Sequence, residues 1–257
     1  MTDEIEEARG QWRTVRPELM NNDGYSSIPT KLVQQIDRCI EQGQLNRAIS
    51  AILEAPHKVL PAINEMFAMA ASVTGLDSDE ILRRTDFHHR DTAPERIESA
   101  FAEVRAINFL HQQEFTQIQP LRQQRTKCAD IIASRDGEPY AVEVVTSIYE
   151  ARGRFTPERL GMWLVERIKS DRKDKQVEAS SGSVHGRRKV FLAVVDSADA
   201  VALQVHDEFQ NAARHVWEKL ECDSDTHVCF VTGRVTLGYG SDDAIFPQWP
   251  ESKEVGV

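Results

Sequence analysis

The sequence has no clustered cysteine pattern. It contains four cysteines, none of them in a CxxC pair, which argues against a zinc knuckle and against a disulfide framework. They lie far apart and are interpreted as reduced thiols: Cys39, Cys128, Cys222 and Cys229.

Long apolar runs are also absent. No stretch approaches the roughly 20 apolar residues that a membrane-spanning helix needs. The N-terminus, Met-Thr-Asp-Glu-Ile-Glu-Glu, is acidic and lacks the basic and apolar regions of a secretion signal. We therefore expect a soluble, cytoplasmic protein.

An excess of positive charge is missing as well. The formal net charge is -10 at pH 7, which argues against a protein that coats nucleic acid non-specifically, because that affinity comes from Lys and Arg that release counterions from phosphate. The average conceals one basic segment, since residues 151–190 contain eleven Lys and Arg against five acids. This asymmetry is compatible with a polyanion partner and equally with a solvated helix and loop.

The first third of the chain is read as two parts. Residues 1–27 are polar and are predicted to form a loose leader. Residues 28–91 are predicted to be an all-helical accessory region, because their apolar residues recur at helical spacing in three groups that Gly43, Pro56 and Gly75 separate. This region has no excess of positive charge, so we expect a plain bundle that could hold a partner protein or form a homodimer.

Residues 92–240 are predicted to form an α/β core. A helix that starts near Pro94 carries a one-sided apolar stripe: Ile97, Phe101, Val104, Ile107 and His111. Strand-like runs and helices then alternate, with strands expected at 115–121, 128–134, 140–146, 190–195 and 227–231, and helices expected from Thr156 and over 199–220. This order predicts a mixed sheet flanked by helices. Residues 241–257 are expected to be a C-terminal tail.

A tight turn in this core brings two acids together. Asp136-Gly137 is a strong signal for a two-residue hairpin, because both central residues of the favoured turn need a positive φ. Counted outward from that turn, Asp130 lies opposite Glu143, with Cβ atoms about 5 Å apart on one face. Two such carboxylates repel each other unless a cation lies between them, and Mg²⁺ or Mn²⁺ is the expected cofactor. A one-residue slip would put the acids on opposite faces.

These residues resemble the PD-(D/E)xK, or restriction-endonuclease-like, superfamily. The resemblance covers roughly residues 94–235 and rests on three pieces: Ala-Glu103-Val-Arg-Ala-Ile-Asn-Phe-Leu, Lys-Cys-Ala-Asp130-Ile-Ile and Tyr-Ala-Val-Glu143-Val-Val-Thr. It implies an αβββαβ core, Asp130 and Glu143 as metal ligands, and Glu103 as the supplementary helix acid. An ordinary surface glutamate is the alternative reading of Glu103.

The chain departs from the superfamily pattern at the motif lysine. The pattern expects Lys two residues after the Glu, where this sequence has Val145, and Lys127 points to the other face of its strand. The next helix offers a substitute, because Arg172 and Lys175 continue its apolar stripe. We expect Lys175 to be catalytic, although side chains that merely extend into solvent at a helix end explain the same pattern.

The expected function is a Mg²⁺-dependent nuclease that acts on DNA. Four cations are expected to contact phosphates: Arg172, Lys173, Arg187 and Arg188. One alternative, which Val145 allows, is a degenerate core that binds nucleic acid or assembles with other proteins. Another is a protein-protein adaptor built on residues 28–85.

Overall fold

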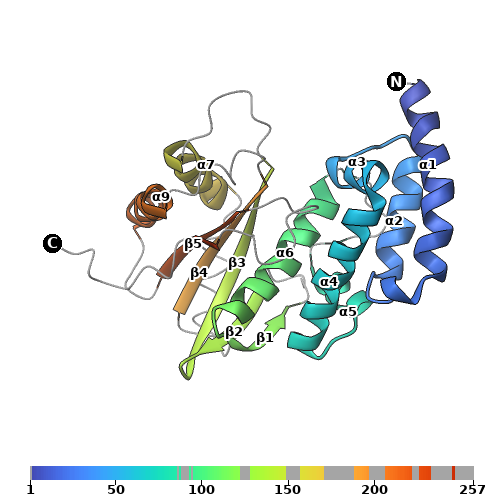
Figure 1. Ribbon diagram of the computed structural model, residues 1–257. Helices are drawn as coiled ribbons and strands as arrows, with labels where there is room; N and C mark the ends of the chain where they lie inside the picture. The colour runs from blue at the N-terminus through green and yellow to red at the C-terminus, as the bar shows by residue number, and fades with distance from the viewer. Residues whose placement is uncertain are drawn as a thin grey trace.

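The computed structural model describes the chain in ten pieces. They are residues 2–85, 87, 93, 95–121, 128–148, 157–170, 188–196, 206–221, 226–232 and 245–246. Figure 1 shows helices of the N-terminal third on one side and a sheet with its own helices on the other.

The predicted all-helical region is confirmed. After α1 (Thr2–Asn21) and the short helix η1 (Asp23–Tyr25), the chain forms four helices: α2 (Thr30–Glu41), α3 (Arg47–Glu54), α4 (Pro56–Thr74) and α5 (Ser78–Arg84). The punctuating residues act as the sequence indicates. Pro56 opens α4 at its first turn, where a missing N–H costs nothing, and Gly75 ends it with a φ of 69°.

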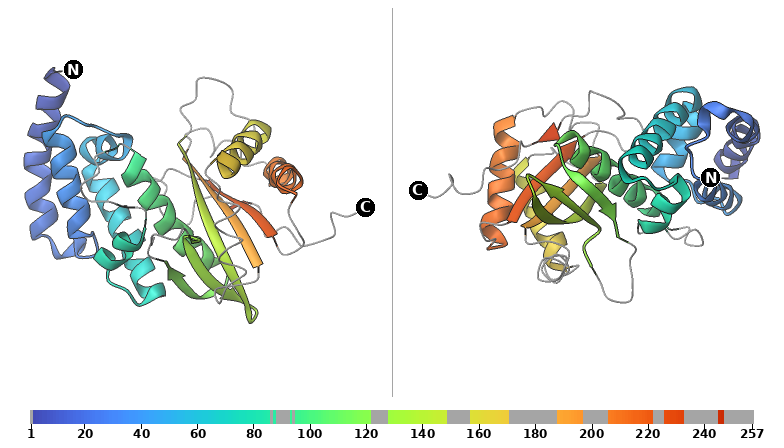
Figure 2. Two further views of the ribbon diagram at one scale, coloured as in Figure 1. Left: turned by 180° about the vertical axis from the view of Figure 1, so that it is seen from behind. Right: turned by 90° about the horizontal axis from the view of Figure 1, so that it is seen from below.

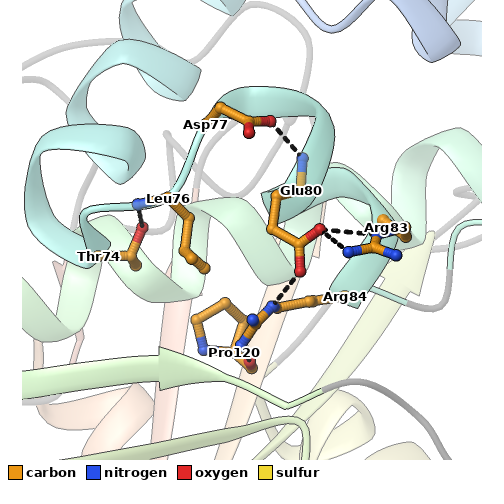
Figure 3. Close-up of polar contacts among 7 residues, drawn as sticks. All are labelled: Thr74, Leu76, Asp77, Glu80, Arg83, Arg84 and Pro120. Atoms are coloured by element: carbon orange, nitrogen blue, oxygen red, sulfur yellow. Dashed lines mark hydrogen bonds and ion pairs between the residues drawn. The ribbon is translucent and has the colours of Figure 1, made fainter.

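The α4–α5 junction shows how local polar contacts fix these ends (Figure 3). The Asp77 side chain accepts the Glu80 N–H at 2.7 Å and caps α5. The Glu80 carboxylate then binds Arg83 and Arg84 on its own helix, and Arg84 Nη1 donates to the Pro120 carbonyl at 3.3 Å. This last bond ties the helical region to the edge of the sheet.

Two consecutive helices together have the length and apolar composition of a membrane-spanning segment. Among the described residues no single helix is long and apolar enough to cross a bilayer. Helices α4 and α5 pass together by length and composition, but they are bent by 85° at their break.

The predicted loose leader is wrong, because residues 2–21 form a long helix. Helix α1 (Thr2–Asn21) packs on α2 and α3. Four of its apolar residues recur at intervals of four, three and four and are buried: Ala8, Trp12, Val15 and Leu19. Trp12 Nε1 and Arg16 Nε each donate to Asp37 of α2 at 2.7 Å. The polar composition concealed a narrow stripe that is sufficient for packing on one side.

Helix α6 (Glu95–Gln112) is the central element. The predicted helix is confirmed, but its one-sided apolar stripe is too narrow a description, because residues on every side of its middle turns are buried. The physical reason is visible in Figure 1, where α6 lies between α4 and the sheet. The Asn108 side chain donates to the Met66 carbonyl at 3.0 Å on the α4 side.

The sheet has six strands in sequence order. They are β1 (Thr116–Pro120), β2 (Ile131–Arg135), β3 (Glu138–Ile148), β4 (Arg188–Asp196), β5 (Thr226–Thr232) and β6 (Ile245–Phe246). The β3–β4 and β4–β5 pairs are parallel and the other pairs are antiparallel. The predicted α/β class with a mixed sheet is therefore confirmed, whereas β6 falls in the predicted tail and was missed.

The two faces of the sheet have different covers. Helices α7 (Pro157–Ser170) and α9 (His206–Lys219) cover one face and α6 covers the other (Figure 2). The α6 face belongs to a large hydrophobic core that continues without interruption into α1 to α5. The α7/α9 face belongs to a smaller core that includes Leu164, Ile168 and Val216. The large core therefore contains residues from both sides of the expected boundary near residue 91.

Candidate functional site

The β2–β3 hairpin has the predicted turn and register. Asp136 and Gly137 have φ values of 52° and 79°, as the favoured two-residue turn requires. The strand pairing runs from Arg135–Glu138 at the turn to Ile131–Val142. The ladder therefore ends one pair before Asp130 and Glu143.

At the end of the ladder, Asp130 forms hydrogen bonds to the backbone of two other residues. Its Oδ2 accepts a hydrogen bond from the backbone N–H of Val144 at 2.8 Å. Its own carbonyl accepts from Leu121 N–H at 2.8 Å. A carboxylate oxygen thus occupies a place that a main-chain carbonyl of β2 would otherwise fill, and the charge-assisted bond fixes the side chain. Asp130 is consequently a positioned acid rather than a loop residue in solvent.

Glu143 belongs to the α7/α9 face. Its strand neighbours Ala141 and Val145 are members of the small core, whereas Val142 and Val144 belong to the large core. Side chains alternate along a strand, so Glu143 points to the small-core side. Asp130 lies outside the observed pairing, and its hydrogen bond to the Val144 N–H brings its carboxylate to the residue that follows Glu143. Glu143 is 0% exposed and Asp130 is 4% exposed. Two carboxylates buried this deeply on adjacent strands require compensating interactions.

Val145, at the position of the motif lysine, is packed in the small core. It is 1% exposed and shares a cluster with Leu164 and Ile168 of α7. It lies on the same face as Glu143, as the sequence predicts. The position therefore contributes apolar packing and no positive charge.

Glu103 approaches the sheet from the other side. It is buried on α6 at 6% exposure. Glu98 accepts the Ala48 N–H of α3 at 3.3 Å and Asn108 binds α4, so the side of α6 that both occupy faces the helical region. At 100° per residue Glu103 lies about 140° from each of them, toward the sheet. That is the α6 face of the sheet, opposite the face of Glu143.

A three-acid metal group is not formed. Over the described parts of the chain, no cluster of three or more His, Cys, Asp or Glu side chains could hold a metal ion. Glu103 therefore does not complete a ligand set with Asp130 and Glu143. The expected ligand set is therefore limited to the two carboxylates of Asp130 and Glu143.

The expected phosphate-contacting cations divide into two groups. Lys175 and its neighbours fall outside the described residues, as do Arg172, Lys173 and Arg187. Arg188 is described and begins β4, where its Nη1 donates to the Tyr140 hydroxyl at 3.0 Å. Arg188 shares a face of β4 with Val190 and Leu192 of the large core, because side chains two residues apart point the same way. It therefore lies on the opposite face from Glu143.

Sequence reasoning missed a cluster around Arg188. Residues on or directly before five neighbouring strands meet on the α6 face near the hairpin: Phe115, Arg135, Tyr140, Arg188 and His227. We call this set the arginine-aromatic row. No signal in the linear sequence could have found it, because its members are spread from Phe115 to His227 and meet only through strand pairing.

Comparison with known proteins adds no family. The chain matches no family model, no curated protein and no solved structure. The fold class stands on the structure itself, an α/β chain with a mixed sheet, and the function has to be argued from its residues.

Proposed function

We propose that the chain is a Mg²⁺-dependent nuclease that hydrolyses phosphodiester bonds in DNA, with Asp130 and Glu143 as ligands of one ion. The observation that carries the proposal is a pair of buried carboxylates at the point where two strands stop pairing, with Asp130 hydrogen-bonded to the residue that follows Glu143. Mg²⁺ takes oxygen ligands, is commonly held by one or two carboxylates and keeps positions for water and phosphate. The residues therefore fit the ion.

The protein groups have separable roles in this proposal. The Val144 N–H holds Oδ2 of Asp130, so the ligand is oriented before the ion arrives. Glu143 supplies the second carboxylate, and its apolar neighbours on the small-core face lower the local dielectric. When bound, the metal would lower the pKa of a water molecule and stabilise charge on the phosphoryl oxygens.

Two further groups complete the proposal. Glu103 is assigned a supporting role from the α6 side. The cation that Val145 does not provide is assigned to Lys175 or Arg172. The αβββαβ order of the described elements is compatible with a restriction-endonuclease-like core, to which we assign the chain as part of the same proposal.

A second candidate function has its own observation. Val145 is part of the small core and Glu143 has no exposed surface, features that suit a core without catalysis. In that case the chain would bind nucleic acid or assemble with other proteins and would have no use for Mg²⁺. The two candidates differ in one measurable property, which is metal binding by the two carboxylates.

The test is a calorimetric titration with Mn²⁺ alone, followed by a DNA cleavage assay in Mg²⁺. Asp130→Asn and Glu143→Gln should each abolish tight Mn²⁺ binding and cleavage. Asp136→Asn is the matched control, because its side chain is 92% exposed and Asn tolerates the positive φ. Mn²⁺ binding that is equal in all four proteins would remove the nuclease proposal and favour the second candidate.

A further inference from the structure

The arginine-aromatic row is ordered across the sheet. Its members follow the strand order: Phe115 directly before β1, Arg135 on β2, Tyr140 on β3, Arg188 on β4 and His227 on β5. Aromatic rings and guanidinium groups therefore alternate over five neighbouring strands. All five positions lie on the α6 face, at the end of the sheet that carries the hairpin.

The rings form a rigid floor for the two arginines. Phe115 and Tyr140 meet edge to face with centroids 5.0 Å apart, and His227 lies 5.9 Å from Tyr140. The Arg135 guanidinium carbon lies over Phe115 at 5.6 Å, and that of Arg188 lies over Tyr140 at 5.7 Å. These distances are within the range of cation–π attraction, which fixes both cations without neutralising them.

The floor is buried, whereas the cations reach the surface. Each of the three rings is at most 5% exposed. The Arg135 side chain is 28% exposed, and Arg188 has intermediate exposure. A guanidinium that lies over a ring presents its N–H donors at its edge, in the fork that matches a phosphate. Buried rings, in contrast, offer no surface on which a base could stack.

Among the described residues, two exposed acids lie beside Arg135. Asp136 is 3.9 Å from Arg135 Nε but is 92% exposed. Glu138 is the cross-strand neighbour of Arg135 and is exposed as well. Interactions between exposed charges are largely screened by solvent and salt.

The row is separate from the carboxylate pair. Tyr140 precedes Glu143 by three residues on β3, which is about 10 Å along a strand, and their side chains point to opposite faces. We propose that the arginine-aromatic row binds backbone phosphates of DNA through Arg135 and Arg188, without reading its sequence. This inference shares the DNA partner of the proposed function but needs no metal.

The experiment measures binding of a labelled DNA duplex in EDTA over a range of salt concentrations. Arg135→Gln and Arg188→Gln should each lower the slope of log affinity against log salt by about one unit, and together they should weaken binding on the order of tenfold. Arg13→Gln, which changes an exposed arginine of α1 far from the sheet, is the matched control. It should leave affinity and slope unchanged.

Two variants keep the test decisive if an arginine variant folds poorly. Glu138→Gln removes an exposed acid beside Arg135 and should tighten binding. Arg188→Lys keeps the charge without the fork and should retain part of the affinity. Equal binding by wild type and by both arginine variants, or no binding by wild type at low salt, overturns the inference. Because the assay contains EDTA, a failed metal titration leaves this result independent.

Discussion

The two faces of the sheet treat charge differently. On the α6 face the arginines stand at the rim, over aromatic rings and partly exposed, so solvent still stabilises them. On the α7/α9 face Glu143 lies in the middle of a strand between Ala141 and Val145, without exposed surface. A rim cation costs the fold little, whereas a buried carboxylate costs several kcal/mol unless it is compensated. In the proposed function a metal ion would contribute to that compensation for Glu143.

Truncation of a buried residue of α6 should cost far more stability than truncation of an exposed apolar residue of α7. Phe101→Ala removes a fully buried ring of α6 that packs edge to face on Phe67 at 6.3 Å. We expect a loss of about 3–5 kcal/mol in the free energy of unfolding, measured by urea denaturation. Met162→Ala on α7 is the control, because Met162 is 51% exposed and should cost less than about 0.5 kcal/mol. Similar losses for both variants would contradict a central role for α6.

The carboxylate of Asp130 accepts a hydrogen bond from the backbone amide of Val144 at the end of the β2–β3 ladder. Asp130→Ala leaves that buried N–H without its acceptor, which should cost about 1–3 kcal/mol in apo protein. Asp130→Asn keeps an acceptor oxygen and should cost clearly less by the same denaturation measurement. If Asn is as destabilising as Ala, the carboxylate is not the acceptor that ends the ladder.

The hairpin turn decides which face Glu143 occupies. Gly137 has a φ of 79°, so Gly137→Ala should destabilise by about 1–2 kcal/mol. Gly10→Ala provides the opposite case, because Gly10 lies inside α1 with nothing within 4 Å of an added Cβ. It should stabilise by about 0.5–1 kcal/mol. Thermal unfolding of the two variants measures both effects, and a neutral Gly137→Ala would argue against the observed turn.

The smallest expected effect is the pH dependence of the α5 ion pairs, far from both faces. Hydrogen bonding to Arg84, with a further contribution from Arg83, lowers the pKa of Glu80. A folded pKa below the unfolded value gives stability above the unfolded pKa that is lost as pH falls through the folded one. Glu80→Gln should therefore reduce the acid-induced loss of stability, by less than about 1 kcal/mol. Unfolding at pH 7 and pH 3 measures this, with exposed Glu65→Gln as the unaffected control.

Local chemistry made much of the fold predictable. The helices that Gly43, Pro56 and Gly75 separate, and the turn at Asp136-Gly137, follow from backbone preferences of single residues. The register of the β2–β3 pairing as far as Ile131–Val142 followed from that turn.

What failed depends on tertiary contacts. Helix α1 was missed because its buried stripe is narrow within a polar segment, and the full burial of α6 depends on elements packed from both sides. The side of the sheet that Glu103 approaches depends on how α6 docks, which its periodicity alone does not determine. The arginine-aromatic row forms only when five strands lie side by side in the sheet, so no local sequence pattern predicts it.

The most direct test of the central claim is a double-mutant cycle in Mn²⁺ affinity with Asp130→Asn, Glu143→Gln and both changes together. If the two carboxylates hold one ion, each single variant loses nearly all affinity and the double variant loses little more. In the absence of metal, each single variant should also relieve repulsion between the two acids. Strictly additive losses, or affinities equal to wild type, would contradict a shared ion between Asp130 and Glu143.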